Sequence, residues 1–245
     1  MGFWAALQFL TIFPTPLGHK ADARLPGQSL PYFPLVGLIL GGILVGLHYG
    51  MSLILPYAIV PALLITTLVI LTGAQNVDGF IDTCDGVFAG KSKRERLDIM
   101  SDTKVGALGI VGIVLLLLLK YTSLFSVSLT LPALLLMPTL SRWTMVAMIF
   151  TFPYAKKFGM GLPFKQGATW QRLTVATVIA LVVAVVLLKW WGLVLMAVLL
   201  LIAFGVASYF QSRLGGLTGD NYGAINELSE VLVLVLIILI SRFQW

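Results

Sequence analysis

Long apolar stretches constrain this chain more than any other feature of its sequence. A helix needs about 20 mostly apolar residues to cross a bilayer, and seven segments come close to that description. They are 33–55, 58–73, 105–127, 129–151, 173–188, 192–209 and 223–240. The spacing of these segments predicts an all-α, polytopic membrane protein with about seven transmembrane helices. We expect the lipid bilayer to be its solvent.

The overall composition agrees with this expectation. Of the 245 residues, 59% are hydrophobic and 11% are charged, whereas a soluble domain carries about 25% charged residues. No linker divides the chain, so we expect a single domain over 1–245, and we expect no cleaved signal peptide. The segment 2–13 is apolar but too short to span, which predicts an N-terminal helix lying in the membrane interface.

Basic residues predict the orientation in the membrane. With seven spans, twelve of the sixteen Lys and Arg residues fall on one side, and the positive-inside rule makes that side cytoplasmic. They are Lys20, Arg24, Lys91, Lys93, Arg94, Arg96, Lys104, Lys156, Lys157, Lys165, Arg172 and Arg213. The other side holds only Lys189 and Arg242, with Lys120 towards it. No basic run is interleaved with aromatic residues, so the net charge of +6 indicates topology and no nucleic-acid partner.

Acidic residues are distributed even less evenly. All ten lie on the predicted cytoplasmic side or in the cytoplasmic end of a span: Asp22, Asp78, Asp82, Asp85, Glu95, Asp98, Asp102, Asp220, Glu227 and Glu230. Acids contribute little to orientation, so a functional site on that side is the better explanation. A transporter would carry polar residues through both leaflets, which makes a one-sided enzyme site the preferred interpretation.

Three aspartates between the second and third predicted spans suggest a metal site. Asp78, Asp82 and Asp85 are spaced i, i+4 and i+7, which places them within about 60° of each other on one helix face. Carboxylates gathered in this way repel one another unless a cation lies between them, and oxygen ligands suit Mg²⁺ or Mn²⁺. The alternative is a solvated face paired with the basic residues at 91–94.

A short amphipathic helix is predicted next, and it carries two further acids. Asp98 and Asp102 are spaced i and i+4, so they share one face. Enzymes that transfer a phosphoalcohol from a cytidine diphosphate donor have a similar layout, with aspartates of two membrane helices holding metal against a diphosphate. That likeness of layout is an analogy, and it keeps a membrane phosphotransferase with a cytidine donor as an alternative.

Two further features indicate phosphate binding. Arg142 lies in the middle of a predicted span, where a charged residue is costly and suggests function; the alternative is a structural ion pair with an acid. A glycine-rich loop precedes the last span and exposes backbone amides that can hold an anion; the alternative is a plain tight turn. Its candidate residues are Gly215, Gly216, Thr218, Gly219 and Asp220.

Together these segments resemble the cobalamin 5′-phosphate synthase family over nearly the whole chain. The motifs that carry the resemblance are 9–16, 78–88, 98–106 with Gly109, Ser141–Arg142 and 215–220. The chain differs from the family pattern at Asn76, where histidine is common, and at Asp98, where glutamate is common. The first difference leaves any role of that histidine to an amide, and the second keeps the charge.

The resemblance implies a reaction in the assembly of the cobalamin nucleotide loop. A hydroxyl of α-ribazole, or of its 5′-phosphate, would attack the cobinamide-side phosphate of adenosylcobinamide-GDP and release GMP. It implies Mg²⁺ as cofactor, Asp82, Asp85 and Asp102 as catalytic ligands, and Asp78 and Asp98 as further metal ligands. Arg142, Lys104 and the 215–220 loop become candidate phosphate contacts. The expected location is the cytoplasmic (inner) membrane of a prokaryote, with the active site on the cytoplasmic side. A homo-oligomer is left open.

Overall fold

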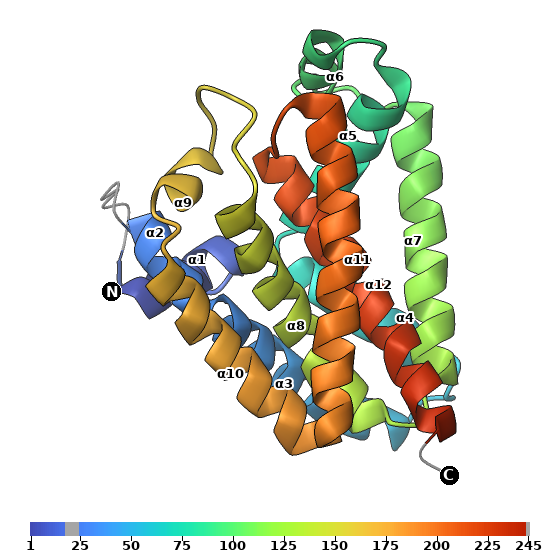
Figure 1. Cartoon of the computed structure of the whole chain (residues 1–245). Helices are drawn as coiled ribbons and strands as arrows, with labels where there is room; N and C mark the ends of the chain where they lie inside the picture. The colour runs from blue at the N-terminus through green and yellow to red at the C-terminus, as the bar shows by residue number, and fades with distance from the viewer. Residues whose placement is uncertain (18–24, 244–245) are drawn as a thin grey trace.

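The computed structural model describes residues 1–17 and 25–243 and is built from helices (Figure 1). Six helices are long and apolar enough to cross a membrane. They are α3 (Phe33–Ser52), α7 (Ala107–Ser126), α8 (Thr130–Thr151), α10 (Trp170–Leu188), α11 (Trp190–Leu214) and α12 (Gly219–Phe243). Within the described residues no β-strand forms, and Tyr154 and Leu217 make an isolated bridge. The predicted all-α, polytopic fold is confirmed.

The seventh candidate crossing is a bent pair of helices. The predicted straight span at 58–73 is wrong, because α4 (Val60–Leu71) has only 12 residues and meets α5 (Gln75–Ala89) at an angle of 92°. Gly73 and Ala74 separate them with φ values of +60° and +57°, a left-handed backbone that a right-handed helix cannot continue through. The carbonyl of Leu71 instead accepts a hydrogen bond of 2.9 Å from the backbone N–H of Ile12.

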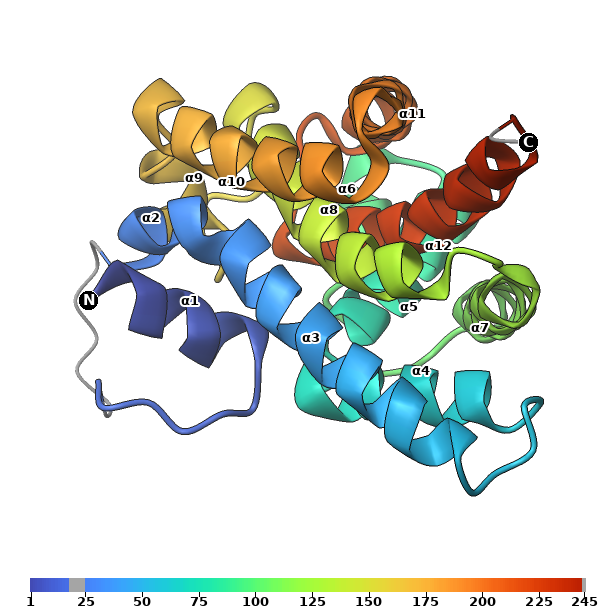
Figure 2. The same ribbon diagram turned by 90° about the horizontal axis from the view of Figure 1, so that it is seen from below.

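Five short helices complete the fold. They are α1 (Gly2–Leu10), α2 (Leu25–Ser29), the 3-10 helix η1 (Leu30–Tyr32), α6 (Lys93–Ile99) and α9 (Leu162–Gln166). The helix predicted within 2–13 forms as α1. Helices α1, α2 and α9 gather on one flank of the bundle, as both views show (Figures 1 and 2). Lys165 of α9 donates hydrogen bonds to the carbonyls of Ile149 and Phe150, which satisfies the open C-terminus of α8.

Helix α8 lies at the centre of the bundle. Its best span window is 89% buried, whereas the corresponding window of α10 is 22% buried. Helix α3 approaches the α8 backbone closely, because a Cβ atom at Gly41 would lie 2.7 Å from the carbonyl oxygen of Leu134. Many apolar side chains of α7, α10 and α11 are exposed, as expected for helices that face lipid.

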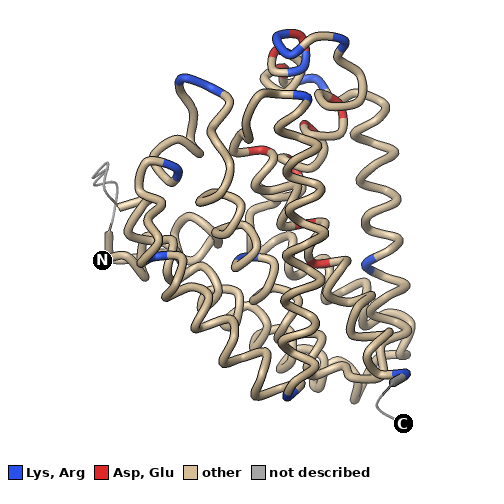
Figure 3. Tube along the Cα trace, viewed as in Figure 1, with Lys and Arg blue, Asp and Glu red and all other residues tan. Residues whose placement is uncertain are grey.

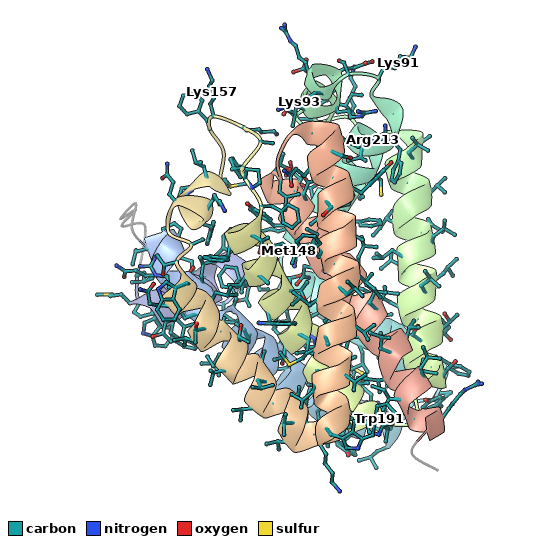
Figure 4. All side chains as sticks on the ribbon, viewed as in Figure 1. Lys91, Lys93, Met148, Lys157, Trp191 and Arg213 are labelled. Carbon is teal, nitrogen blue, oxygen red and sulfur yellow. The ribbon has the colours of Figure 1, made fainter. Side chains whose placement is uncertain are left out.

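Charged residues divide the two ends of the bundle as the sequence predicts. Lysine and arginine gather at the end that carries α6 (Figure 3). Figure 4 places Lys91, Lys93, Lys157 and Arg213 at this end and Trp191 at the opposite one. We call the former the basic end. The predicted cytoplasmic residues Lys20, Asp22 and Arg24 lie outside the described residues.

Candidate active site

Two helix N-termini cross in close contact near the basic end. A Cβ atom at Gly79 of α5 would lie 2.7 Å from the carbonyl oxygen of Asp220, and one at Gly223 of α12 would lie 3.1 Å from the Cα of Asn76. Side chains larger than hydrogen would push these backbones apart. The two glycines therefore bring the first turns of α5 and α12 together, with the acids that each turn carries.

Three aspartates meet at this crossing. Asp78 and Asp220, from different helices, lie close enough to Asp82 for their charges to act on it, and so does Asp85. Asp82 is half-buried, so water screens this repulsion only in part. We call Asp78, Asp82 and Asp220 the acidic crossing. The charge cluster predicted from i, i+4 spacing is thus completed by an acid 138 residues away from Asp82, taken from the glycine-rich loop.

Lys156 is the cation that offsets this repulsion. Its ammonium lies 3.9 Å from a carboxylate oxygen of Asp220 and donates a hydrogen bond of 3.0 Å to Ser101. A short backbone pairing holds it there: Ala155 N–H donates to the carbonyl of Leu217 at 2.8 Å, and Leu217 N–H donates to that of Pro153 at 2.8 Å. Within the described part of the chain, one lysine faces three carboxylates, which is an excess of negative charge at the crossing.

The glycine-rich loop is anchored to the protein at its start and faces open space at its end. Gly216 and Thr218 are buried, and a Cβ atom at Gly216 would lie 2.8 Å from the backbone of Ala155. The Thr218 N–H donates a 2.9 Å hydrogen bond to the side chain of Asn221, whose amide donates to Thr83 on α5. Of the five loop residues predicted to bind phosphate, only Gly219 and Asp220 border a cavity.

That cavity has a volume of about 750 Å³, within the range of about 300–1,000 Å³ typical of small-molecule sites. Its floor is the helix crossing, formed by Gln75, Asn76, Asp78, Gly219 and Asp220. The remaining lining residues come mainly from helices α1, α2, α8 and α9. The floor therefore combines carboxylates with two helix N-termini, whose open N–H groups attract negatively charged ligands.

Tyr154 and Tyr222 border the same region. Tyr154 lies in the loop after α8, against Gly161 and Gly219, and its ring centroid is 6.3 Å from that of Tyr222. Burial raises the pKa of Tyr154, so its phenol stays protonated. The Tyr222 hydroxyl is buried and has no hydrogen-bond partner within the described residues. Sequence reasoning missed Lys156 and both tyrosines, because their placement depends on loop pairings that join distant segments.

Asp85 points away from the cavity floor into a structural contact. Its two carboxylate oxygens accept hydrogen bonds from the backbone N–H groups of Gly106 at 2.7 Å and Gly109 at 2.8 Å. These amides begin α7, where a negative charge is stabilising. Asp85 is buried, and both oxygens are already used. The geometry favours this structural role over the metal ligation that we predicted.

The other predicted acids and Lys104 lie at the surface. Asp98 pairs with Arg94 at 3.9 Å, with side chains 74% and 91% exposed. Asp102 accepts a 3.2 Å hydrogen bond from the backbone N–H of Lys104, and both residues are exposed. Neither Asp98, Asp102 nor Lys104 borders the cavity. The structure thus does not bring the two predicted acid clusters onto one surface.

Arg142 lies in a buried ion network. It is fully buried on α8 and pairs with Glu230, the same acid that binds Lys120 at 2.6 Å. Lys120 also binds Glu227 at 2.5 Å. The structural alternative for Arg142 is therefore favoured over the predicted phosphate contact. Glu227 and Glu230 do not mark a site at the cytoplasmic end of the span, since they neutralise buried cations in the bundle interior.

The described residues place no three His, Cys, Asp or Glu side chains at metal-ligating distance from one another. A magnesium ion in a phosphate-transfer site needs only one or two carboxylates, because substrate phosphates and water complete its shell. The unbalanced charge of the acidic crossing meets that requirement. These residues therefore fit a Mg²⁺ site that forms with a diphosphate, and they do not form an all-protein cage.

Comparison with known proteins identifies the family. A family model described as cobalamin-5-phosphate synthase matches residues 2–238. The adenosylcobinamide-GDP ribazoletransferase of Geotalea daltonii is 38% identical over 240 residues, covering 98% of this chain and 97% of that protein. The enzyme of the same name from Desulforamulus reducens is 39% identical over 237 residues, covering 96% and 94%. No solved structure matches. This chain belongs to the cobalamin-5-phosphate synthase family.

Proposed function

We propose that this protein is an adenosylcobinamide-GDP ribazoletransferase, which joins adenosylcobinamide-GDP to α-ribazole or its 5′-phosphate in cobalamin synthesis. The near-full-length similarity to enzymes of that name carries the substrate assignment. The observation that carries the site is the acidic crossing, of which Asp78 and Asp220 line the floor of a nucleoside-sized cavity and Asp82 lies close enough for their charges to act on it. A cytidine-donor transferase remains an analogy of layout that no match supports.

The reaction breaks a phosphoanhydride bond of the donor and forms a new phosphate ester bond to the acceptor. A ribazole hydroxyl attacks the phosphorus next to the cobinamide, the new P–O bond forms, and the bond to the bridging oxygen breaks. GMP leaves with that oxygen, and the proton of the attacking hydroxyl passes to a base. We assign the base to a carboxylate of the acidic crossing, because an acceptor held on the cavity floor would lie against these groups.

Mg²⁺ bound at the acidic crossing would neutralise the diphosphate and the charge that develops on the leaving GMP. We assign its protein ligands to Asp78, Asp82 and Asp220. Lys156 lies beside Asp220 and would contact the diphosphate as a second positive charge. The first-turn N–H groups of α5 and α12 face the same floor and would hold phosphate oxygens.

We further propose that the basic end faces the cytoplasm of a prokaryotic inner membrane, which places the acidic crossing on the cytoplasmic side. Labelling in intact cells tests this. Lys157→Cys should react only after permeabilisation, and Lys189→Cys should react from outside. The single native cysteine, Cys84, is buried and should give little background. External labelling of Lys157→Cys would reverse the orientation.

The decisive test of function is turnover by the purified protein in lipid vesicles. Adenosylcobinamide-GDP, α-ribazole and Mg²⁺ should yield GMP and a corrinoid with a closed nucleotide loop, detected by chromatography and mass spectrometry. The same vesicles with a cytidine diphosphate-alcohol donor should yield no CMP. Release of CMP without release of GMP would replace the proposed function with the phosphotransferase alternative.

A further inference from the structure

The cavity has two chemically different halves. Its floor at the acidic crossing is polar and charged. A second set of lining residues is apolar, and we call it the apolar wall: Phe9, Leu17, Leu25, Pro26, Met160 and Phe164. These residues come from α1, α2, α9 and the loops beside them, and Met160 is next to Gly161, which lies against Gly219 of the floor. A ligand that fills the cavity must therefore place an apolar group on the wall and a polar or anionic group on the floor.

Aromatic side chains fix the shape of the apolar wall. The rings of Phe9 and Phe164 lie 4.4 Å apart between centroids, and both lie within about 6 Å of Phe33 behind them. Phe33 is completely buried and Phe164 is nearly so. Phe9 is half-buried, so one side of its ring faces the cavity while its contacts with Phe33 and Phe164 restrict the ring's position. A flat, apolar ring system packs well on such a surface.

Among the described residues near the apolar wall, the polar side chains of Ser29 and Gln8 both have hydrogen-bond partners. The hydroxyl of Ser29 donates to the carbonyl of Pro26 at 2.6 Å, and the side-chain oxygen of Gln8 accepts from Thr15 at 3.2 Å. A guanine base carries several donors and acceptors on its edge, and it loses affinity where these groups meet no partner. A benzimidazole base linked to ribose carries one acceptor nitrogen and no donor, so it leaves fewer polar groups unpaired. The wall therefore suits an apolar bicyclic base better than guanine.

We propose that the apolar wall binds the benzimidazole base of the ribazole acceptor, so that its ribose points towards the acidic crossing. This inference rests on the proposed function and adds which substrate occupies which half of the cavity. The donor then reaches the floor with its diphosphate, while its corrin, much larger than a nucleoside, stays outside. A lipid chain is a poorer occupant, because it would exclude water from the carboxylates of the floor and offer them no hydrogen-bond or ionic partner, which costs free energy.

A matched pair of substitutions on one helix tests the assignment. Phe9→Leu removes the ring that faces the cavity, and Phe3→Leu makes the same change at a residue of α1 that does not border it. We expect Phe9→Leu to raise KM for α-ribazole about tenfold, the equivalent of one lost ring contact. KM for adenosylcobinamide-GDP should stay unchanged, and Phe3→Leu should leave both values unchanged.

A second pair of substitutions, at exposed loop residues, keeps the proposal testable if the Phe9 variant misfolds. Met160 is 86% exposed and borders the cavity, whereas Phe158 is 84% exposed in the same loop and does not. Met160→Ser should weaken α-ribazole binding, measured by calorimetry without donor, and leave GMP binding unchanged, because it removes apolar surface without adding a charge. Phe158→Ser should change neither.

Three results would overturn the assignment: a rise in KM for the donor instead of the acceptor, unchanged kinetics in both wall variants, or an effect that disappears when the vesicle lipid is changed. The last result would make the wall a lipid site. Failure of the proposed function is distinguishable, because wild-type protein would then release no GMP with any acceptor concentration.

Discussion

Helix α12 carries two groups of charges that differ in one respect. Near its start, Asp220 joins Asp78 and Asp82, and among the described residues Lys156 is the cation that pairs with this group. Further along, Glu227 and Glu230 are matched by the cations Lys120 and Arg142 within the bundle. Asp78 and Asp220 of the unbalanced group line the cavity of about 750 Å³, and no residue of the balanced group lines it. In a membrane protein, excess charge at a cavity indicates a ligand, whereas matched buried charge indicates packing.

The largest loss of activity should follow Asp82→Asn, a substitution in the unbalanced group. This change keeps the size of the side chain and removes a charge that the cation and diphosphate require. We expect GMP release to fall at least about a thousandfold, the equivalent of losing several kcal/mol of charge stabilisation. The thermal midpoint should stay the same or rise, because one repulsion is lost. A variant with near-normal turnover would remove Asp82 from the site.

Substitution in the balanced group should lower stability and leave activity intact. Glu230→Gln leaves Arg142 without its carboxylate, and we expect a loss of about 3 kcal/mol of stability, typical of breaking a buried ion pair. Activity per folded molecule should remain. Arg242→Gln, at the exposed end of the same helix, is the control and should leave the thermal midpoint unchanged. Lost activity with unchanged stability would instead favour the phosphate contact predicted for Arg142.

A substitution at Asp85 tests whether this residue is a metal ligand, as its spacing predicts, or a structural acceptor at the start of α7, as its contacts indicate. In Asp85→Asn, the amide oxygen can still accept from one of the N–H groups of Gly106 and Gly109, but the new NH2 group would face the other, and two donors cannot pair. We expect a loss of about 2 kcal/mol of stability, the range for a hydrogen bond to a charged group, with turnover per folded molecule retained. Thermal unfolding and GMP release measured on one preparation separate the two effects. Abolished turnover at unchanged stability would restore Asp85 as a metal ligand.

The helices could be predicted from the sequence because burial in lipid demands long apolar segments, and six such segments form long helices. The break at Gly73 and Ala74 could not, since a left-handed pair leaves no trace in hydropathy. Helical spacing grouped Asp78 with Asp82 correctly on one face. The same spacing could not show that Asp85 turns to the start of α7, because that contact depends on Gly106 and Gly109, more than 20 residues away.

Long-range pairing explains the remaining differences. Asp220 joins Asp78 and Asp82 only because two helices cross at Gly79 and Gly223, and Arg142 meets an acid 88 residues away. Charge alone does not reveal which of several acids a buried arginine will contact. Both interpretations of Arg142 followed from its position in a span, and the structure favours the ion pair because it places Glu230 beside Arg142.

The smallest effect should come from Asp98, although it belongs to the motif that resembles the family. Its side chain is 74% exposed and meets only Arg94 at 3.9 Å, and exposed pairs of this kind contribute little. We expect Asp98→Asn to change turnover by less than about twofold, measured as GMP release under the conditions used for Asp82→Asn. A loss as large as that of Asp82→Asn would mean that α6 closes over the acidic crossing during turnover.

A magnesium titration of GMP release tests the unbalanced charge of the acidic crossing most directly. Wild-type protein treated with EDTA should be inactive and should recover as Mg²⁺ is added back. Asp220→Asn should need a higher Mg²⁺ concentration for half-maximal release, by about 10-fold or more for the loss of one ligand. Asp98→Asn should follow the wild-type curve. Full wild-type activity in excess EDTA, or superimposable curves for wild type and Asp220→Asn, would contradict a metal site at the crossing.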